Sequence, residues 1–425
     1  MPLPITATRV AHLWEVLCRS YSVLGLPEDR IFRDLVLARI VEPTSMLDSE
    51  RVLSEIGVPA VPYRILTRWL PDYAKESWCQ ALTKACAAHA ALGPASLLLY
   101  DVTTLRCEID AGDGFCEPGF SKQRHLHPQI TIGLITDATG FPLLVQGFEG
   151  NKAEKATMLP VRTEFMTTHQ IKDVVVVADA GMISAANQDA IETAGLSYVL
   201  GTVIADIPYV VKEWRQANPG EQMPDGLVLT QPWPASSLEK ERGKHDRTIY
   251  SQYTHDRARR TLRGVDEQIG NAKSAVTGKV PVKRNRFIKL TGAQKSVNRD
   301  LEAKVRSLAG IKSYTTNVTN PTPEFVIGAY ANLWRIEKSF RMSKHDLQAQ
   351  PIYHHKRESI DAHLAIVFAA LTVTRHIEAA TGWSIKRFVQ TTRRYRTIQI
   401  QASNHTLTAE DPLPADLRDA LTQIP

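Results

Sequence analysis

The pattern of hydrophobic and polar positions changes character near residue 95. Before it, apolar side chains recur at helical spacing, and this recurrence predicts a helical N-terminal domain. The expected helices are Thr6–Gly25, Arg30–Val41, a third that starts at an Asp48 N-cap and ends at Gly57, Tyr63–Leu70, and Asp72–Leu92. Two roles remain open for this domain. Val52–Leu70, VLSEIGVPAVPYRILTRWL, fits a DNA-binding helix-turn-helix, and packing or dimerisation fits equally well.

From Ala95 onward, short apolar runs alternate with amphipathic segments, which is typical of an α/β fold. The predicted order is three strands, a helix, a strand, a helix and a strand: Ser96–Thr103, Gln129–Thr136, Phe141–Glu149, Glu154–Thr168, Val174–Ala178, Ser184–Ala194 and Ser197–Gly201. The turn DATG, residues 137–140, joins the second strand to the third. An antiparallel meander extended by parallel strands predicts an RNase H-like mixed sheet.

Residues 203–313 interrupt this core with short strands and a basic helix. The expected elements are the strands Gly226–Leu229, Asp246–Tyr253 and Asn285–Leu290 and the helix His255–Val276. A strand at Lys312–Thr316 leads back to the core, and an apolar helix at Ser359–Ala380 should pack on the sheet. The predicted domains are 1–93, helical; 94–202 with 314–383, the core; 203–313, an insertion; and 384–425, a basic and finally loosely ordered tail.

Charge is distributed unevenly along the chain. The net charge is +6, but residues 240–312 hold 19 Lys and Arg against 7 Asp and Glu, a net of +12. The rest of the chain therefore carries −6. A basic block in a mildly acidic remainder predicts a surface that faces a polyanion, and a solvated Lys- and Arg-rich loop region is the alternative.

Composition narrows the class of protein further. With 425 residues, 43% hydrophobic and 23% charged, the chain is typical of a soluble protein of two to four domains. No run approaches the roughly 20 apolar residues of a membrane span, and no secretion signal is visible. Five scattered cysteines without CxxC or zinc spacing fit a reducing cytosol. These features predict a cytoplasmic protein.

Two aspartates stand at the ends of apolar strands. Asp101 follows LLLY, and Asp179 follows VVVVA. An unpaired buried carboxylate is costly, so each of them requires a compensating partner. Two such residues in one sheet could lie side by side and share a divalent metal ion. Alternatively, each caps a turn or the next helix.

The stretch Tyr330–Lys344, YANLWRIEKSFRMSK, predicts one helix because it has no Gly or Pro and no strand-like alternation. At about 100° per residue, Tyr330, Glu337, Arg341 and Lys344 share a broad face. A carboxylate flanked by cations and an aromatic ring indicates a metal ligand beside a phosphate backbone. An ordinary surface pair between Glu337 and Arg341 is the alternative interpretation.

This stretch resembles the Tyr-Arg-Glu-Lys signature helix of bacterial insertion-sequence transposases of the DDE class. The matching residues are Tyr330, Trp334, Ile336, Glu337 and Lys344. Leu333 occupies the position of the signature Arg, and Arg341, one turn past Glu337, is the better candidate for the missing cation. Other blocks resemble the same family: DVTTL at 101, GFSKQRHLHPQITIGLI at 119, GFEGNKAEKAT at 147, VVADAGMISAANQDAI at 176, and PIYH at 351.

The resemblance implies that Asp101, Asp179 and Glu337 are catalytic carboxylates that bind two Mg²⁺ ions, with Mn²⁺ as a substitute. It further implies contacts to transposon-end DNA, for which the candidates are Tyr330, Lys344, Arg341, Lys338 and Trp334. For the Trp334 indole, core packing is favoured over stacking on a distorted base. His125 and His127, in the loop before the second strand, are assigned neither to DNA nor to metal, and His363 is expected to be a core histidine. Gly150 and Asn151 should shape a turn.

The function implied by the resemblance is a DNA transposase that cleaves terminal inverted repeats and joins them to target DNA. Its partners would be double-stranded DNA and a second copy of the chain, in the bacterial cytoplasm at the nucleoid. Two alternatives remain: a structure-specific nuclease with the same core, and a DNA-binding regulator without catalysis.

Overall fold

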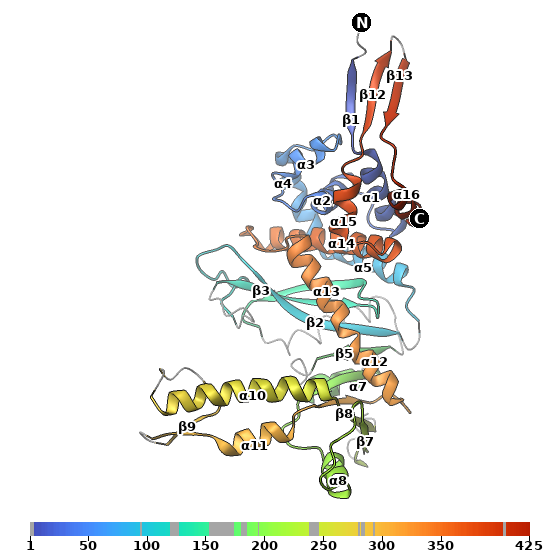
Figure 1. Cartoon of the computed structure of the whole chain (residues 1–425). Coiled ribbons are helices and arrows are strands. Elements are labelled where there is room, and N and C mark those ends of the chain that lie inside the picture. The colour runs from blue at the N-terminus through green and yellow to red at the C-terminus, as the bar shows by residue number, and fades with distance from the viewer. Residues whose placement is uncertain are drawn as a thin grey trace. The chain divides into compact units, whose positions relative to one another are not determined.

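The computed structural model describes residues 4–93, 96–119, 127–152, 174–179, 185–193, 195–237, 246–278, 281, 285–291, 294–402 and 405–425. The chain forms two compact units, which Figure 1 shows coloured along the sequence. Unit 1 comprises residues 1–174 and 332–425, and unit 2 comprises residues 175–331. The mixed α/β class is confirmed, and the division into domains at residues 93, 202, 313 and 383 stays a prediction.

The helices predicted for the N-terminal part of unit 1 are present. They are α1 (Ala11–Val23), α2 (Arg30–Val41), α3 (Ser49–Glu55), α4 (Tyr63–Tyr73) and α5 (Glu76–Ala90). The first begins later than predicted, because Ile5–Arg9 forms strand β1 and pairs with a strand near the C-terminus. The connection between α3 and α4, residues 56–62, is longer than the usual turn of a helix-turn-helix. A DNA-binding role for these helices stays a prediction.

An antiparallel meander follows in unit 1, as predicted. It consists of β2 (Leu97–Arg106), β3 (Gln129–Thr136) and β4 (Pro142–Glu149), in the spatial order β4-β3-β2. Every residue of β3 is buried, so the central strand of the three is covered on both faces. The helix predicted at Glu154–Thr168 lies outside the described residues.

Helix α14 (Arg357–Thr381) is the core helix of unit 1 and confirms the helix expected at Ser359–Ala380. It packs against α2, α4 and β4, between the N-terminal helices and the meander (Figure 1). Among the described helices, it is long and apolar enough to cross a membrane by composition, with a mean hydropathy of 1.3. However, 89% of that segment is buried inside the protein, which is the situation of a core helix.

The C-terminal tail is ordered, so the prediction of a loosely ordered end was wrong. It forms α15 (Ile385–Thr392), β12 (Thr397–Ala402), β13 (His405–Glu410) and α16 (Ala415–Gln423). Strands β1, β12 and β13 make a three-stranded antiparallel sheet, which extends beyond the helices of unit 1 in Figure 1. The alternation of Ile398 and Ile400 with glutamines suits a strand, and the partner strand comes from the other end of the chain.

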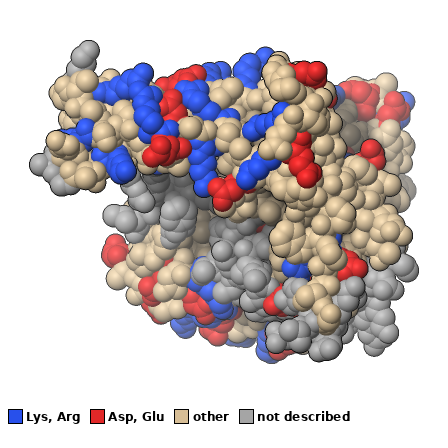
Figure 2. All heavy atoms as spheres, turned by 90° about the horizontal axis from the view of Figure 1, so that it is seen from below, with Lys and Arg blue, Asp and Glu red and all other residues tan. Residues whose placement is uncertain are grey.

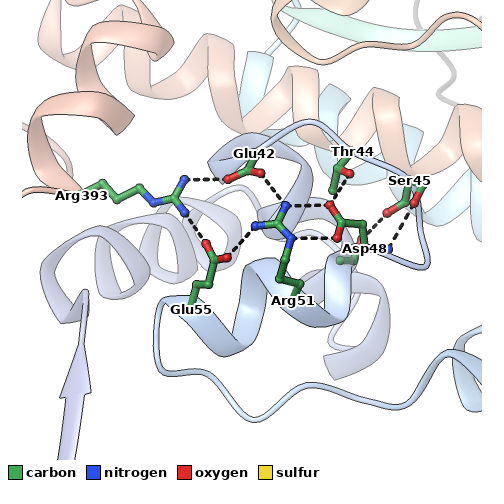
Figure 3. A network of polar contacts seen from close by, with 8 residues as sticks. Glu42, Thr44, Ser45, Asp48, Arg51, Glu55 and Arg393 are labelled. Carbon is green, nitrogen blue, oxygen red and sulfur yellow. Dashed lines mark hydrogen bonds and ion pairs between the residues drawn. The ribbon is translucent and has the colours of Figure 1, made fainter.

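A network of ion pairs ties the C-terminal segment to the N-terminal helices (Figure 3). Arg393, at the end of α15, donates to Glu42 at 2.9 Å and to Glu55 at 2.8 Å. Arg51 donates to Glu42, Asp48 and Glu55, and Asp48 therefore binds an arginine instead of capping α3 with its side chain. The pKa of Glu42 is lowered by the hydrogen bonds from Arg51 and Arg393, and hydrogen bonds from Arg51 and Thr44 lower that of Asp48 to about 2.

We expect this network to lose its stabilising effect in acid. A carboxyl group whose pKa is lower in the folded than in the unfolded state stabilises the folded state at pH values above the unfolded pKa. The unfolded pKa is 4.5 for Glu42 and 3.8 for Asp48. Protonation of these groups in the folded state removes the stabilisation as the pH falls toward 2. The substitution Arg51→Gln should therefore lower the midpoint of urea unfolding at pH 7 and lower it much less at pH 2.5. The control Arg19→Gln removes an arginine that binds the carbonyl of Leu421, so its effect should be similar at both pH values. An equal effect of Arg51→Gln at both pH values would contradict this assignment.

One pair of cysteines is joined in unit 1. Cys107, directly after β2, forms a disulfide with Cys116, whereas the other described cysteines, Cys18, Cys79 and Cys86, are thiols outside this bond. The sequence analysis described the scattered cysteines as fitting a reducing cytosol and did not predict this bond. The two cysteines are nine residues apart in the sequence, and this spacing did not identify them as a disulfide pair.

Unit 2 contains strands close to those predicted from Val174 onward, except that the strand predicted at Gly226–Leu229 runs from Val228 to Trp233. They are β5 (Val175–Ala178), β6 (Ser197–Thr202), β11 (Ile311–Thr316), β8 (Arg247–Tyr253) and β7 (Val228–Trp233), named in spatial order. β5 and β6 are parallel and are connected through α7 (Ala185–Thr193), and the other neighbours are antiparallel. Helices α8 (Tyr209–Ala217) and α12 (Pro323–Ala331) complete this part, and α12 packs on β5, β6 and β11.

The rest of unit 2 is a small basic module that we call the arm, residues 255–307. It consists of α10 (His255–Val276), β9 (Ile288–Thr291), β10 (Gln294–Val297) and α11 (Arg299–Ser307). The arm has a hydrophobic cluster of its own, in which Val265, Ile269 and Ala272 of α10 pack around Phe287. Its helix α10 matches the predicted bounds, because the apolar positions Val265, Ile269 and Ala272 recur at helical spacing.

Candidate active site

The stretch predicted as one helix, Tyr330–Lys344, is divided into three parts. Tyr330 belongs to the end of α12, α13 spans Leu333–Arg341, and Met342–Asp346 forms a π-helical turn, η2. The chain turns at Asn332, where the amide of Arg335 donates to the Asn332 carbonyl at 2.9 Å. Asn332 is the N-cap of α13, but its side chain makes no capping hydrogen bond. The single shared face expected for these residues is therefore absent.

Helix α13 presents a polar face to solvent and an apolar face to unit 1. Leu333, Ile336 and Phe340 are buried, and Trp334, Glu337 and Arg341 are exposed. Trp334 is 56% exposed, so the favoured prediction of a core indole was wrong. Leu333, Ile336 and Phe340 lie 100° or more from Trp334 around the helix axis, so the indole ring points away from the core. Glu337 thus lies between an exposed aromatic ring and an exposed cation.

Asp101 lies on β2, the strand against which α13 packs. Its carboxylate is half-buried, and Oδ1 accepts a hydrogen bond from the amide of Val102 at 2.8 Å. Thr103, two residues further and so on the same face of the strand, accepts a hydrogen bond from Lys344 Nζ at 2.7 Å. The ammonium group of the signature lysine is therefore fixed on the strand that carries Asp101.

The backbone after η2 is held by two side chains, the half-buried Arg39 and the buried His363. Arg39 of α2 donates to the carbonyls of Leu347, at 3.0 Å, and Gln348, at 3.3 Å, and burial lowers the pKa of this arginine to about 10. His363 is a buried core histidine, as predicted, and its ring lies 3.1 Å from the carbonyl of Ala349. Burial lowers the pKa of His363 well below its usual value, so this nitrogen donates from a neutral ring. The PIYH block is hydrogen-bonded to β2, because the amide of Ile352 donates to the Arg106 carbonyl at 2.8 Å.

Lys338 follows Glu337 in the sequence, but its positive charge is neutralised by an ion pair within the protein. Its ammonium group pairs with Glu378 of α14 at 2.7 Å. Glu378 is largely buried and also lies 3.9 Å from Arg375. Sequence spacing gave no signal for Glu378, because it is far from α13 in the chain and sits in an apolar helix. A contact between Lys338 and DNA stays a prediction.

Asp179 follows β5 in unit 2 and is exposed. The hydroxyl of Tyr330, which is buried, donates a hydrogen bond to its Oδ1. The Tyr330 ring also lies 4.0 Å from Lys312 Nζ and packs against Tyr314 at 4.9 Å between centroids. Tyr330 therefore orients a predicted metal ligand, and a direct contact of this residue with DNA stays a prediction. Lys312, which the sequence analysis did not single out, supplies a cation to this cluster.

The three predicted carboxylates are divided between the units. Asp101 and Glu337 belong to unit 1, and Asp179 belongs to unit 2. Over the described part of the chain, no group of three or more His, Cys, Asp or Glu side chains forms a metal site. The donor set itself suits a hard cation, because all three groups are carboxylates and Asp179 has the hydrogen-bonded outer partner that metal ligands commonly have.

The remaining predicted residues have simpler positions. Gly150 and Asn151 form the turn after β4, as expected, and a Cβ on Gly150 would lie 1.9 Å from the carbonyl oxygen of Gln129. His127 is exposed, and His125 lies outside the described residues.

Comparison with known proteins assigns the family. Residues 92–373 match the model of the transposase DDE domain, which is more than half of the chain. No curated protein matches the sequence. A cryo-electron microscopy structure of a piggyBac transposase synaptic complex with hairpin DNA is similar at 11% identity and a TM-score of 0.47, over 90% of this chain and 78% of that one. With Asp101 and Glu337 inside the matched segment and presented by packed elements, the chain belongs to the family of transposases with a DDE domain.

Proposed function

We propose that this transposase cleaves the ends of its transposon and joins them to target DNA in a cut-and-paste reaction, on an RNase H-like core. Asp101, Asp179 and Glu337 are the catalytic carboxylates of the proposal. The observation that carries it is the presentation of Glu337 on the exposed face of α13, while the opposite part of this helix packs on the strand of Asp101. A carboxylate that forms no ion pair or hydrogen bond with the described residues, on a helix fixed this firmly, is typical of a ligand-binding role.

The carboxylates would hold two Mg²⁺ ions, for which Mn²⁺ can substitute. When bound, such ions activate the attacking oxygen and stabilise the leaving one in an in-line displacement. In the first step a water oxygen bonds to the scissile phosphorus, and the 3′ oxygen leaves as a hydroxyl. In the second step that 3′-OH attacks a phosphorus of target DNA and displaces a target 3′ oxygen. The phosphodiester count is conserved in the second step, so no external energy source is needed.

Side chains around Glu337 would bind the transposon end. Arg341 is exposed one turn after Glu337 and is our candidate for the cation that replaces the signature arginine, whose position is occupied by the buried Leu333. The exposed Trp334 ring, with the Arg335 guanidinium 5.7 Å from its centroid, offers a surface on which a base can stack. Lys344, held near Asp101 through Thr103, would place a positive charge beside the scissile phosphate.

The arm would contact the phosphate backbone. Four of its cations are exposed and form neither a hydrogen bond nor an ion pair with another described residue: Arg263, Lys273, Lys289 and Lys295. Other cations of the arm are neutralised locally, such as Arg259 by Asp256 at 2.7 Å and Arg306 by Glu302 at 3.0 Å. On the face that Figure 2 shows, Lys and Arg are accordingly interspersed with Asp and Glu. The unpaired cations make the arm suited to sequence-independent binding.

Strand transfer is the experiment that tests the proposal. The full chain should cut a linear DNA that carries the native transposon end in the presence of Mg²⁺, and it should join a pre-cut end to a supercoiled plasmid. Cleavage without joining of the pre-cut end would identify a structure-specific nuclease instead. DNA binding without cleavage in Mg²⁺ or Mn²⁺ would identify a regulator.

Two ends must be brought together in cut-and-paste transposition, so we propose a homodimer in the DNA complex. We also propose that the protein acts in the bacterial cytoplasm, at the nucleoid when bound to DNA. Sedimentation of the protein with and without end DNA tests the first proposal, and a complex with one protein copy and two ends would contradict it.

A further inference from the structure

The turn between β3 and β4 is attached to the helices of unit 1 by an unusual set of contacts. Three consecutive carbonyls of this turn, at residues 138, 139 and 140, each accept a hydrogen bond from a different side chain. The donors are Arg335 Nη1 to Ala138 O at 2.8 Å, Arg375 Nη2 to Thr139 O, and Ser339 Oγ to Gly140 O at 2.8 Å. Two of the three donors belong to α13, the helix of Glu337, and the third belongs to the core helix α14.

The turn is also held together by hydrogen bonds of its own. Asp137 Oδ1 accepts hydrogen bonds from the amides of Thr139, at 2.8 Å, and Phe141, at 2.9 Å, and from the Thr139 hydroxyl at 2.7 Å. The amide of Gly140 donates to the Asp137 carbonyl at 3.0 Å. Asp137 thus accepts hydrogen bonds from the amides of Thr139, Gly140 and Phe141. The carbonyls of residues 138–140 accept hydrogen bonds from side chains of the helices.

Gly140 permits the close approach of the turn to α13. Its φ of +83° is in the region that glycine adopts without strain. A Cβ at this position would lie 2.9 Å from the carbonyl oxygen of Arg335 and 2.9 Å from Arg375 Nη2. A side chain on Gly140 would therefore push against the backbone of α13 itself.

These contacts fix how α13 is rotated about its own axis. Arg335 and Ser339 are one helical turn apart and lie on the same side, whereas Glu337 lies about 200° around the helix from Arg335. Ser339 is fully buried, and the side chain of Arg375 is 12% exposed, so the attachment is screened from water. Holding the Arg335 and Ser339 side on the turn keeps the Glu337 side turned outward.

We propose that the β3–β4 turn is a rotational lock for the catalytic helix, and that Gly140, Arg335, Ser339 and Arg375 are positioning residues for Glu337. The proposal rests on the proposed role of Glu337 as a metal ligand. A helix that rotates by a fraction of a turn moves this carboxylate away from its metal while leaving the exposed DNA-binding side chains on the surface.

Two substitutions test the lock in the full chain. Gly140→Ala and Ser339→Ala should each lower the rate of end cleavage about tenfold to a hundredfold, because a misplacement of about 1 Å costs this much. They should also raise the Mg²⁺ concentration for half-maximal cleavage severalfold, while binding of end DNA in EDTA stays within about twofold. Loss of folded protein alone would lower the cleavage amplitude without changing the metal requirement, so the metal titration separates the two causes.

Each substitution has a matched control. Gly382→Ala introduces a Cβ at a φ of +68° with no neighbouring atom within 4 Å, so it imposes similar backbone strain away from the turn. Ser343→Ala removes a hydroxyl that donates one turn back along the helix, to Ser339 O at 3.0 Å, without reaching the turn. The lock is refuted if the test variants need no more Mg²⁺ than their controls. If Glu337→Ala itself cleaves normally, the proposed function fails and not only the lock.

Discussion

Replacement of Asp101, Asp179 or Glu337 by alanine is expected to abolish Mg²⁺-dependent cleavage of transposon ends. Loss of one carboxylate ligand removes several kcal/mol of stabilisation from the displacement, which corresponds to a decrease of about a thousandfold or more in rate. Binding of end DNA should remain largely intact, because none of the three carboxylates attracts a phosphate. Gel assays of cleavage in Mg²⁺ and of binding in EDTA measure both properties on the same variants.

The control for these variants is Glu324→Ala. Glu324 is an exposed carboxylate in the first turn of α12, on the same side of the long insertion as Glu337, and has no predicted catalytic role. It should cleave at the wild-type rate. Retained cleavage in any of the three test variants would remove that residue from the mechanism, and loss of DNA binding together with cleavage would indicate a structural role instead.

Neutralising the unpaired cations of the arm should give the second large effect. If Arg263, Lys273, Lys289 and Lys295 are changed to glutamine together, affinity for DNA should fall about a hundredfold to a thousandfold near 0.1 M salt. Each lost phosphate contact should also reduce the slope of log affinity against log salt concentration by about 0.9. The effect should be similar for transposon ends and unrelated DNA, since backbone contacts carry no sequence information. Fluorescence anisotropy over a range of salt concentrations measures both quantities.

The chain offers a control of equal size in the same arm. Four of its other cations are paired with carboxylates: Arg259, Arg299, Lys304 and Arg306. Their joint change to glutamine should alter the salt dependence much less, because the neighbouring carboxylates already offset their charge. Equal slopes for the two quadruple variants would show that the arm does not select DNA through its unpaired cations.

Periodicity predicted the regular elements well because burial dictates them. The bounds of α2, α10 and β3 agree with the prediction to the residue, since each has a continuous apolar stripe or run. Asp179 directly follows β5, as predicted, whereas the prediction that Asp101 stands near a strand end was wrong, because β2 continues to Arg106. The resemblance to transposases also led to the family that the comparison shows.

Contacts between distant parts of the chain could not be predicted from the pattern of hydrophobic and polar positions. The interruption at Asn332 depends on local hydrogen bonding that propensity alone does not decide, and it separates Tyr330 from Glu337. Core packing was favoured over base stacking for Trp334, but its exposure is set by the burial of Leu333 and Ile336 on another side of the helix. The donors to the β3–β4 turn and the partner of Lys338 come from α13 and α14, more than thirty residues apart, and no spacing rule connects them.

The pairing of β1 with β12 has a consequence for synthesis on the ribosome. Unit 2 is one uninterrupted segment, so all of it leaves the exit tunnel before translation ends. Unit 1 is built from both ends of the chain, and its first strand waits for residues 397–402. The N-terminal helices therefore emerge early but receive α14, their core helix, only after unit 2 has been made. Release of a shortened polypeptide would leave these helices with exposed apolar faces and make it a substrate for chaperones and proteases.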